Sequence, residues 1–138
     1  MRVLALYGEP NIGKTTSLLL LYKKLLASGF VQVMGYYKRF SNGDIIDVLE
    51  KEGVLIGIVT LGDYVKGIKS LKYYLKKLKD AGCLKAVCAA SKTTNKIQPL
   101  DHIKYYTYHL IIPKTIEIRK SKQLVINTND ANLIFNMI

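Results

Sequence analysis

The chain has 138 residues, of which 49% are apolar and 22% charged, and its net charge is +11. This balance predicts one globular domain over residues 1–138 and excludes a disordered or fibrous chain. The lysine excess favours polyanionic partners such as nucleotides or nucleic acid, although a lysine-rich solvent-facing surface explains the same charge without any partner.

The first predicted elements are a strand, a loop with two glycines and a helix. Residues 2–7, RVLALY, form a short apolar run of the kind found in buried parallel strands. After the loop, Leu18, Leu21 and Leu25 recur at helical spacing, and the predicted helix 14–29 ends at its glycine.

The next segments favour β-structure. Residues 30–40 are rich in β-branched and aromatic side chains. Asn42-Gly43 is a turn signal that favours a hairpin, so residues 44–53 are predicted as a short returning strand, with a helical turn as the alternative. Residues 54–63, VLIGIVTLGD, form the most strand-like run in the chain.

The second half continues the alternation of helices and strands. We predict, in chain order, a helix at 64–80, a strand at 83–90, a loop at 91–101, three strands at 104–113, 115–121 and 123–128, and a terminal helix at 129–138. Together these elements predict an α/β fold, a three-layer sandwich with a mainly parallel sheet.

Residues 8–16 read GEPNIGKTT and match the spacing G-x-x-x-x-G-K-[ST] between an apolar strand and an amphipathic helix. In such a loop the backbone N–H groups and the helix N-terminus face phosphate oxygens. Lys14 would reach the β- and γ-phosphates, and Thr15 would bind Mg²⁺ through its hydroxyl. A glycine-rich turn with an incidental lysine is the structural alternative. The residues expected to bind the nucleotide here are Gly8, Asn11, Ile12, Gly13, Lys14, Thr15 and Thr16.

This segment resembles the Walker A motif of P-loop NTPases. The resemblance implies a parallel sheet with flanking helices, and a nucleoside triphosphate and Mg²⁺ as cofactors. ATP is favoured, because the chain lacks the N-K-x-D motif that recognises guanine. The wider pattern, with GIVTLGD at 57–63 and VCAASKTT at 87–94, resembles small uncharacterised bacterial or phage P-loop ATPases. That resemblance implies a nucleotide-binding role for Lys92.

An acid at the end of a neighbouring strand usually completes the magnesium site of such proteins. Asp63 follows the strand-like run 54–63 and is our candidate metal ligand and, with Lys14, catalytic residue. Capping the next helix is the alternative role for Asp63. Further candidates are Thr60, and Asp44 or Asp47 if the hairpin folds over the site. Glu9 lies inside the loop and is expected to face solvent.

The function predicted from these residues is a Mg²⁺-dependent ATPase with an accessory or switch role. We expect weak intrinsic hydrolysis, because no glutamate follows Asp63, unless a second copy of the chain or a protein partner completes the site. A nucleoside or nucleotide kinase is the first alternative, although the three arginines form no lid pattern. A nucleotide-sensing module that binds nucleic acid is the second.

The predicted helix 64–80 is strongly basic. Lys66, Tyr73 and Lys77 cluster opposite its apolar stripe. A solvated helix face is the favoured interpretation, and lysines interleaved with tyrosine also make nucleic acid a candidate partner. The apolar runs are far shorter than the roughly 20 residues that span a bilayer, so we expect no membrane span and a cytoplasmic protein.

Overall fold

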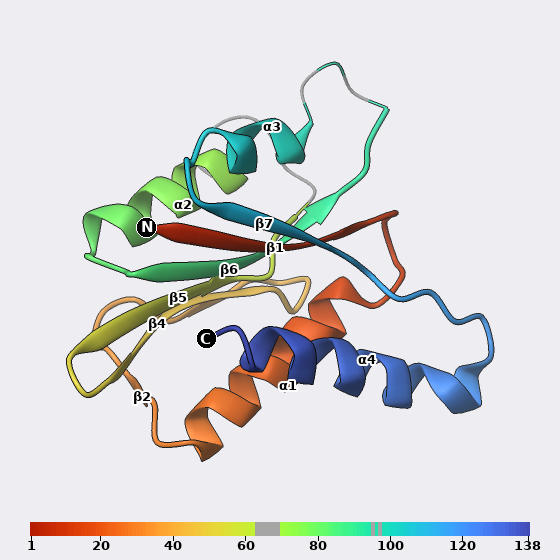
Figure 1. Cartoon of the computed structure of the whole chain (residues 1–138), viewed down its shortest axis with the longest axis horizontal. Helices are drawn as coiled ribbons and strands as arrows, with labels where there is room; N and C mark the ends of the chain where they lie inside the picture. Colours follow the sequence, from red (N-terminus) through yellow and green to blue (C-terminus); the bar gives the residue numbers. More distant parts are fainter. Residues whose placement is uncertain (63–69, 95, 97) are drawn as a thin grey trace.

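The computed structural model describes residues 1–62, 70–94, 96 and 98–138. Its four helices and seven strands within these ranges alternate along most of the chain (Figure 1). The helices are α1 (Lys14–Ala27), α2 (Leu71–Asp80), α3 (Pro99–Lys104) and α4 (Lys120–Phe135). The strands are β1 (Arg2–Gly8), β2 (Val31–Gln32), β3 (Lys38–Arg39), β4 (Ile45–Lys51), β5 (Val54–Val59), β6 (Lys85–Ser91) and β7 (His109–Pro113).

All seven strands belong to one sheet, in the order β2-β4-β5-β6-β1-β7, with β3 also paired to β4. The strands β5, β6, β1 and β7 are parallel, which agrees with the predicted α/β class. However, β4 runs antiparallel to β5, and both β2 and β3 run antiparallel to β4. The prediction of a mainly parallel sheet was therefore wrong, because the sheet is mixed.

The antiparallel pairing of β4 with β5 arises from a tight turn. Glu52 and Gly53 connect β4 to β5 as a two-residue loop, since Lys51 pairs with Val54. Both loop residues have positive φ, at 53° and 80°, as a type I′ hairpin turn requires. No crossover helix separates these two strands, so β5 runs back beside β4 in the opposite direction.

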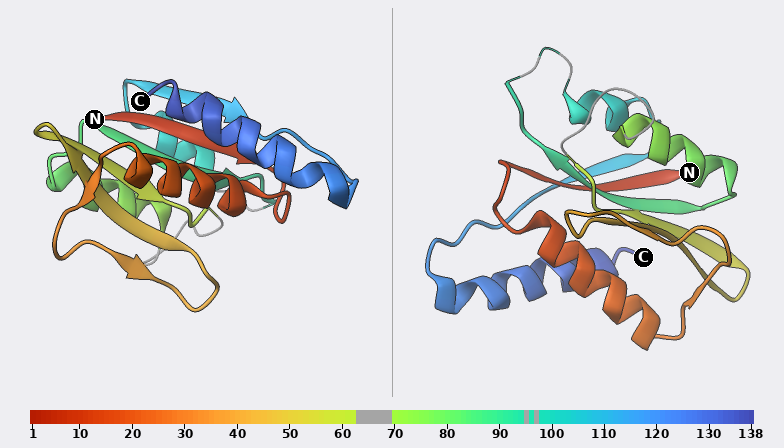
Figure 2. Two further views of the ribbon diagram at one scale, coloured as in Figure 1. Left: turned by 90° about the horizontal axis from the view of Figure 1, so that it is seen from below. Right: turned by 180° about the vertical axis from the view of Figure 1, so that it is seen from behind.

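Helices cover both faces of the sheet (Figures 1 and 2). On one face, α1 and α4 pack through a buried core that includes Leu18, Leu21 and Ile134. On the other face, α2 and α3 pack through a second core that includes Leu75 and Ile103. The three-layer arrangement expected from the sequence is thus present.

A crevice lies at the carboxyl ends of the central strands β1 and β6. The neighbouring parallel strands β1 and β6 are followed by helices on opposite faces, α1 after β1 and α3 after β6. In open α/β sheets, ligands bind outside the carboxyl ends of strands whose connections diverge in this way. The crevice therefore lies where the segment GEPNIGKTT leaves β1.

The segment 115–128 differs from its predicted structure. Two strands were expected there, yet α4 occupies Lys120–Phe135, and the helix predicted at 129–138 is only its C-terminal part. The buried residues of α4 are Asn127, Asp130, Ala131 and Ile134, which follow helical spacing. Two of these four are polar, so a hydrophobic pattern could not reveal the helix.

Two other helices also differ from expectation. The described part of the predicted helix 64–80 begins after Ser70, whose hydroxyl oxygen accepts a hydrogen bond from Tyr73 N. Helix α3 begins at Pro99 inside the predicted loop, where Gln98 and Asp101 form a capping box. Across the described ranges, no helix combines the length and apolarity needed to cross a membrane.

Candidate functional site

The loop between β1 and α1 forms one wall of the site. Gly13 is the N-cap of α1 with φ of 96°, and Asn11 also has positive φ, at 60°. Glycine adopts this conformation without steric cost, and asparagine tolerates it better than most residues. Gly13 has no side chain, and no side-chain hydrogen bond caps the start of α1.

The side chain of Lys14 folds back along the loop. The residue is only 6% exposed, and its Nζ donates hydrogen bonds to the carbonyl oxygens of Gly8, at 3.1 Å, and Glu9. These two contacts hold the ammonium group over the loop. Its positive charge therefore adds to the partial positive charge of the helix N-terminus.

The acid beside Thr15 is Asp44, which precedes β4. Its Oδ1 accepts hydrogen bonds from Thr15 Oγ1, at 3.1 Å, and from Thr60 Oγ1, at 2.8 Å. Its Oδ2 accepts a bond from Asn42 Nδ2 at 2.8 Å. The carboxylate thus joins the start of α1 to the end of β5 in a nearly buried position, with Asp44 9% exposed.

The other candidate acids have different positions. Asp47 is completely buried, and its Oδ2 accepts hydrogen bonds from Tyr22 Oη at 2.7 Å and Gln32 Nε2 at 3.0 Å. Burial, reinforced by Asp47, raises the pKa of Tyr22 well above its usual value. The Asp47 carboxylate therefore already has its hydrogen-bond partners inside the fold. Asp63, the acid favoured from the sequence, lies outside the described residues.

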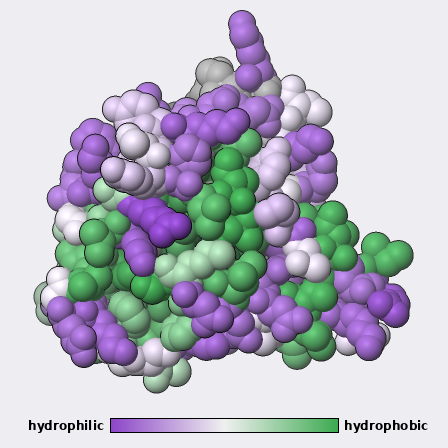
Figure 3. Space-filling view, in the orientation of Figure 1, coloured by the Kyte–Doolittle hydropathy of each residue, from purple (hydrophilic) through white to green (hydrophobic). Residues whose placement is uncertain are grey.

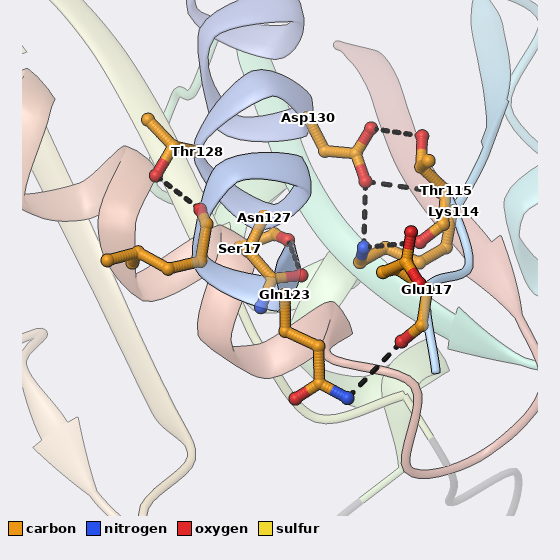
Figure 4. A network of polar contacts seen from close by, with 9 residues as sticks. Ser17, Lys114, Thr115, Glu117, Gln123, Asn127, Thr128 and Asp130 are labelled. Carbon is orange, nitrogen blue, oxygen red and sulfur yellow. Dashed lines mark hydrogen bonds and ion pairs between the residues drawn. The ribbon is translucent and has the colours of Figure 1, made fainter. Parts of the chain in front are cut away.

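Helix α4 forms the wall opposite the loop (Figure 4). Asn127 is 8% exposed, and its Oδ1 lies 3.3 Å from Ser17 Oγ, which donates to it. A Cβ placed on Gly13 would lie 2.8 Å from the same Oδ1. The absence of a side chain at Gly13 therefore lets α4 approach the loop between β1 and α1, a contact that sequence reasoning missed.

A buried network fixes the start of the segment that leads to α4 (Figure 4). Lys114 Nζ lies 2.8 Å from Asp130 Oδ2, and their side chains are 0% and 6% exposed. Asp130 also accepts hydrogen bonds from Thr115 N and Thr115 Oγ1, at 3.1 and 2.7 Å. This network anchors α4 to the carboxyl end of β7.

These walls enclose a cleft of about 670 Å³. Asp44, Thr60 and Asn127 line it, together with Ile116, Glu117, Ile118 and Gln123 before and within α4. At the rim, Arg119 makes a bidentate ion pair with Glu117, with distances of 2.9 and 3.0 Å. Of the residues predicted from the sequence, the cleft brings together Asn11, Ile12, Gly13, Lys14, Thr15 and Thr16.

Two predicted residues lie beside the cleft. Gly8 ends β1, and its carbonyl accepts hydrogen bonds from Lys14 Nζ and from Lys92 N. The side chain of Lys92 is 62% exposed and lies 3.8 Å from Glu9 Oε1. The backbone N–H of Lys92 therefore contacts the loop, while its ammonium group forms a solvent-exposed ion pair with Glu9.

The donor atoms of the cleft suit a hard cation next to a phosphate. Mg²⁺ prefers oxygen ligands and is usually bound by one or two protein groups together with substrate phosphates. Thr15 Oγ1 and the Asp44 carboxylate provide such oxygens within 3.1 Å of each other. Among the described residues, no three His, Cys, Asp or Glu side chains cluster as a metal site.

Comparisons with known proteins identify no relative: no protein-family model, curated protein or solved structure matches this chain.

Proposed function

We propose that this chain binds a nucleoside triphosphate, ATP in the first instance, together with Mg²⁺, through the cleft at the carboxyl ends of β1 and β6. The observation that carries the proposal is the convergence of Thr15 and Thr60 on Asp44, in a cleft that Lys14 at the start of α1 also lines. These groups come from three separate segments. The contacts of Thr15 and Thr60 with Asp44 support a binding site more strongly than the loop motif does alone.

Each group has a distinct role in this proposal. The N–H groups at the start of α1 bind phosphate oxygens, and Lys14 exchanges its carbonyl partners for the β- and γ-phosphates. Thr15 and Asp44 hold the cation, which would neutralise charge on the phosphates. Asn42 and Thr60 orient the Asp44 carboxylate through hydrogen bonds.

Among the described residues, the two carboxylates that line the cleft support weak intrinsic hydrolysis, because both already have hydrogen-bond partners. Both oxygens of Asp44 accept hydrogen bonds, and Glu117 forms a bidentate pair with Arg119. The Arg119 guanidinium also lowers the pKa of Glu117. Neither group is therefore poised to take a proton from an attacking water, which fits an accessory or switch protein that a partner activates.

The test is isothermal titration with ATP, with Mg²⁺ or with a chelator, on three proteins: the unchanged chain, Lys14→Ala and Lys23→Ala. Lys23 is an exposed lysine of the same helix, so its variant removes an equal charge without touching the loop. We expect Lys14→Ala to lose about 10- to 100-fold in affinity, the value of a charge-assisted hydrogen bond. Lack of ATP binding by the unchanged chain, or equal losses in both variants, contradicts the proposal.

A second assay separates hydrolysis from phosphoryl transfer. Phosphate release is measured with and without nucleosides or nucleoside monophosphates as acceptors. We expect slow release that acceptors do not change, well below an ordinary enzyme rate of about 10 per second. Phosphorylated acceptor in the products would instead identify a kinase.

A further inference from the structure

A second cavity is lined by residues of α2 and of the end of α3. Both helices lie on the face of the sheet opposite to α1 and α4 (Figure 1). This cavity, the α2–α3 groove, has a volume of about 440 Å³. Lys72, Lys76 and Lys79 line it from α2, and Tyr105 and Tyr106 line it from the end of α3. The part of the surface above α2 and α3 is mainly hydrophilic (Figure 3).

The spacing of the apolar residues in α2 explains why the lysines face the groove. Leu71, Leu75 and Leu78 are completely buried against the sheet, which leaves positions 72, 76 and 79 on a flank of the helix. These positions are four and three residues apart, so their side chains form one row. The row of ammonium groups therefore follows the length of the groove.

Two aspartates also line the groove, but each already has a partner. Asp80 lies 2.8 Å from Lys76 Nζ in an exposed ion pair, and Asp101 Oδ2 accepts a hydrogen bond from Gln98 N. Within the described ranges, neither Lys72 nor Lys79 lies within ion-pair distance of a carboxylate. The groove thus offers positive charge that no carboxylate of the described residues compensates.

The groove also offers aromatic surface. Tyr105 is 81% exposed, and its ring contacts Tyr106 edge to face, with centroids 5.6 Å apart. Lys79 Nζ lies 6.0 Å from the centroid of the Tyr106 ring. A large aromatic ring held at the surface beside lysines is the combination on which single-stranded nucleic acids bind, by stacking of bases and contacts to phosphates.

We propose that the α2–α3 groove binds single-stranded nucleic acid, with a base stacked on Tyr105 and the phosphates paired with Lys72 and Lys79. The volume of the α2–α3 groove suits one or two nucleotides. Sequence-specific binding of a duplex would instead need a helix or strand pair that enters the major groove of the DNA. An anionic membrane is disfavoured because the lysine row is accompanied by tyrosines rather than by an aliphatic face.

The experiment is fluorescence anisotropy with a labelled oligonucleotide of about 12 residues, as DNA and as RNA, between about 50 and 200 mM salt. The variants are the double replacement Lys72→Ala with Lys79→Ala, and Tyr105→Ala. The control is the double replacement Lys120→Ala with Lys122→Ala, which removes the same charge from the exposed start of α4.

We expect the groove double variant and Tyr105→Ala each to weaken binding roughly ten-fold, and the control double variant to change it less than two-fold. Tyr105→Phe keeps the ring and should retain the affinity. The proposal is overturned if the control weakens binding as much as the groove variants, if duplex binds more tightly, or if only anionic vesicles or acidic peptides bind. Since Lys14→Ala leaves the groove intact, its oligonucleotide affinity should equal that of the unchanged chain whatever happens to ATP binding.

Discussion

Replacing Asp130 by alanine would leave the Lys114 ammonium buried without its carboxylate. The two side chains are 0% and 6% exposed, and Nζ lies 2.8 Å from Oδ2. Removal of one partner from a buried ion pair costs about 3–5 kcal/mol, because the remaining charge stays desolvated. Lys114 Nζ keeps its hydrogen bond to Thr115 O at 2.7 Å, so we expect the lower end, about 3 kcal/mol.

That loss corresponds to a large change in thermal stability. For a chain of 138 residues, the entropy of unfolding is about 0.3 kcal/mol/K, so Tm should fall by about 10 °C. The double variant Lys114→Met with Asp130→Leu removes both charges, and its free energy of unfolding should return to within about 1 kcal/mol of the unchanged chain. The measurement is urea unfolding followed by circular dichroism, with a thermal melt alongside.

The matched control is Asp80→Ala, which breaks the exposed pair with Lys76, whose side chains are 72% and 62% exposed. An exposed pair contributes little, so the free energy of unfolding should change by less than about 0.5 kcal/mol. The reasoning would be refuted by a loss below about 1 kcal/mol for Asp130→Ala. It would also be refuted by a double variant no more stable than the single one, since then burial of charge is not the cause.

Three further predictions concern the cleft and the core. Asp44→Asn should lower Mg²⁺-dependent ATP affinity about 10- to 100-fold and leave affinity in chelator nearly unchanged, as titration with and without metal would show; equal losses in both conditions contradict it. Gly13→Ala should lower the free energy of unfolding more than Gly43→Ala, because both have positive φ but only at Gly13 does the new Cβ collide, 2.8 Å from Asn127 Oδ1. Burial raises the pKa of Cys88 to about 12, so the folded state keeps the thiol protonated. Its contribution to stability is complete below the usual thiol value near 9 and falls as pH rises from there towards 12, which unfolding titrations between those limits would test.

The parts of the site that follow from local sequence were predictable. The run 2–7, the loop and the helix 14–29 follow one another directly in the sequence, so local patterns reveal them, and the structure places β1, the loop and α1 there. Residues 11–16 line one cleft. Their roles in nucleotide binding stay predictions.

The opposite walls of the cleft depend on tertiary contacts that local patterns do not encode. Asp63 was favoured over Asp44 because the acid of such a site usually follows the end of a neighbouring strand, and Asp63 lies outside the described residues. Asp44 reaches Thr15 because β4 pairs antiparallel with β5. Asn127 was missed because its segment contains Leu124, Val125 and Ile126, which favour a strand, while two buried polar residues obscure the helical period.

The hairpin turn that joins β4 to β5 determines where Asp44 lies in the cleft, although the turn is at the opposite end of both strands. Glu52 and Gly53 set the pairing of the two strands, and that pairing brings Ile45 N to 2.8 Å from Thr60 Oγ1 and so Asp44 beside Thr60. One residue inserted in this turn would shift the strand by roughly 3.3 Å and reverse which face each side chain occupies. The position of Asp44 thus depends on a two-residue turn at the other end of the seven residues of β4, and grafting the loop GEPNIGKTT onto another sheet would not carry the acid with it.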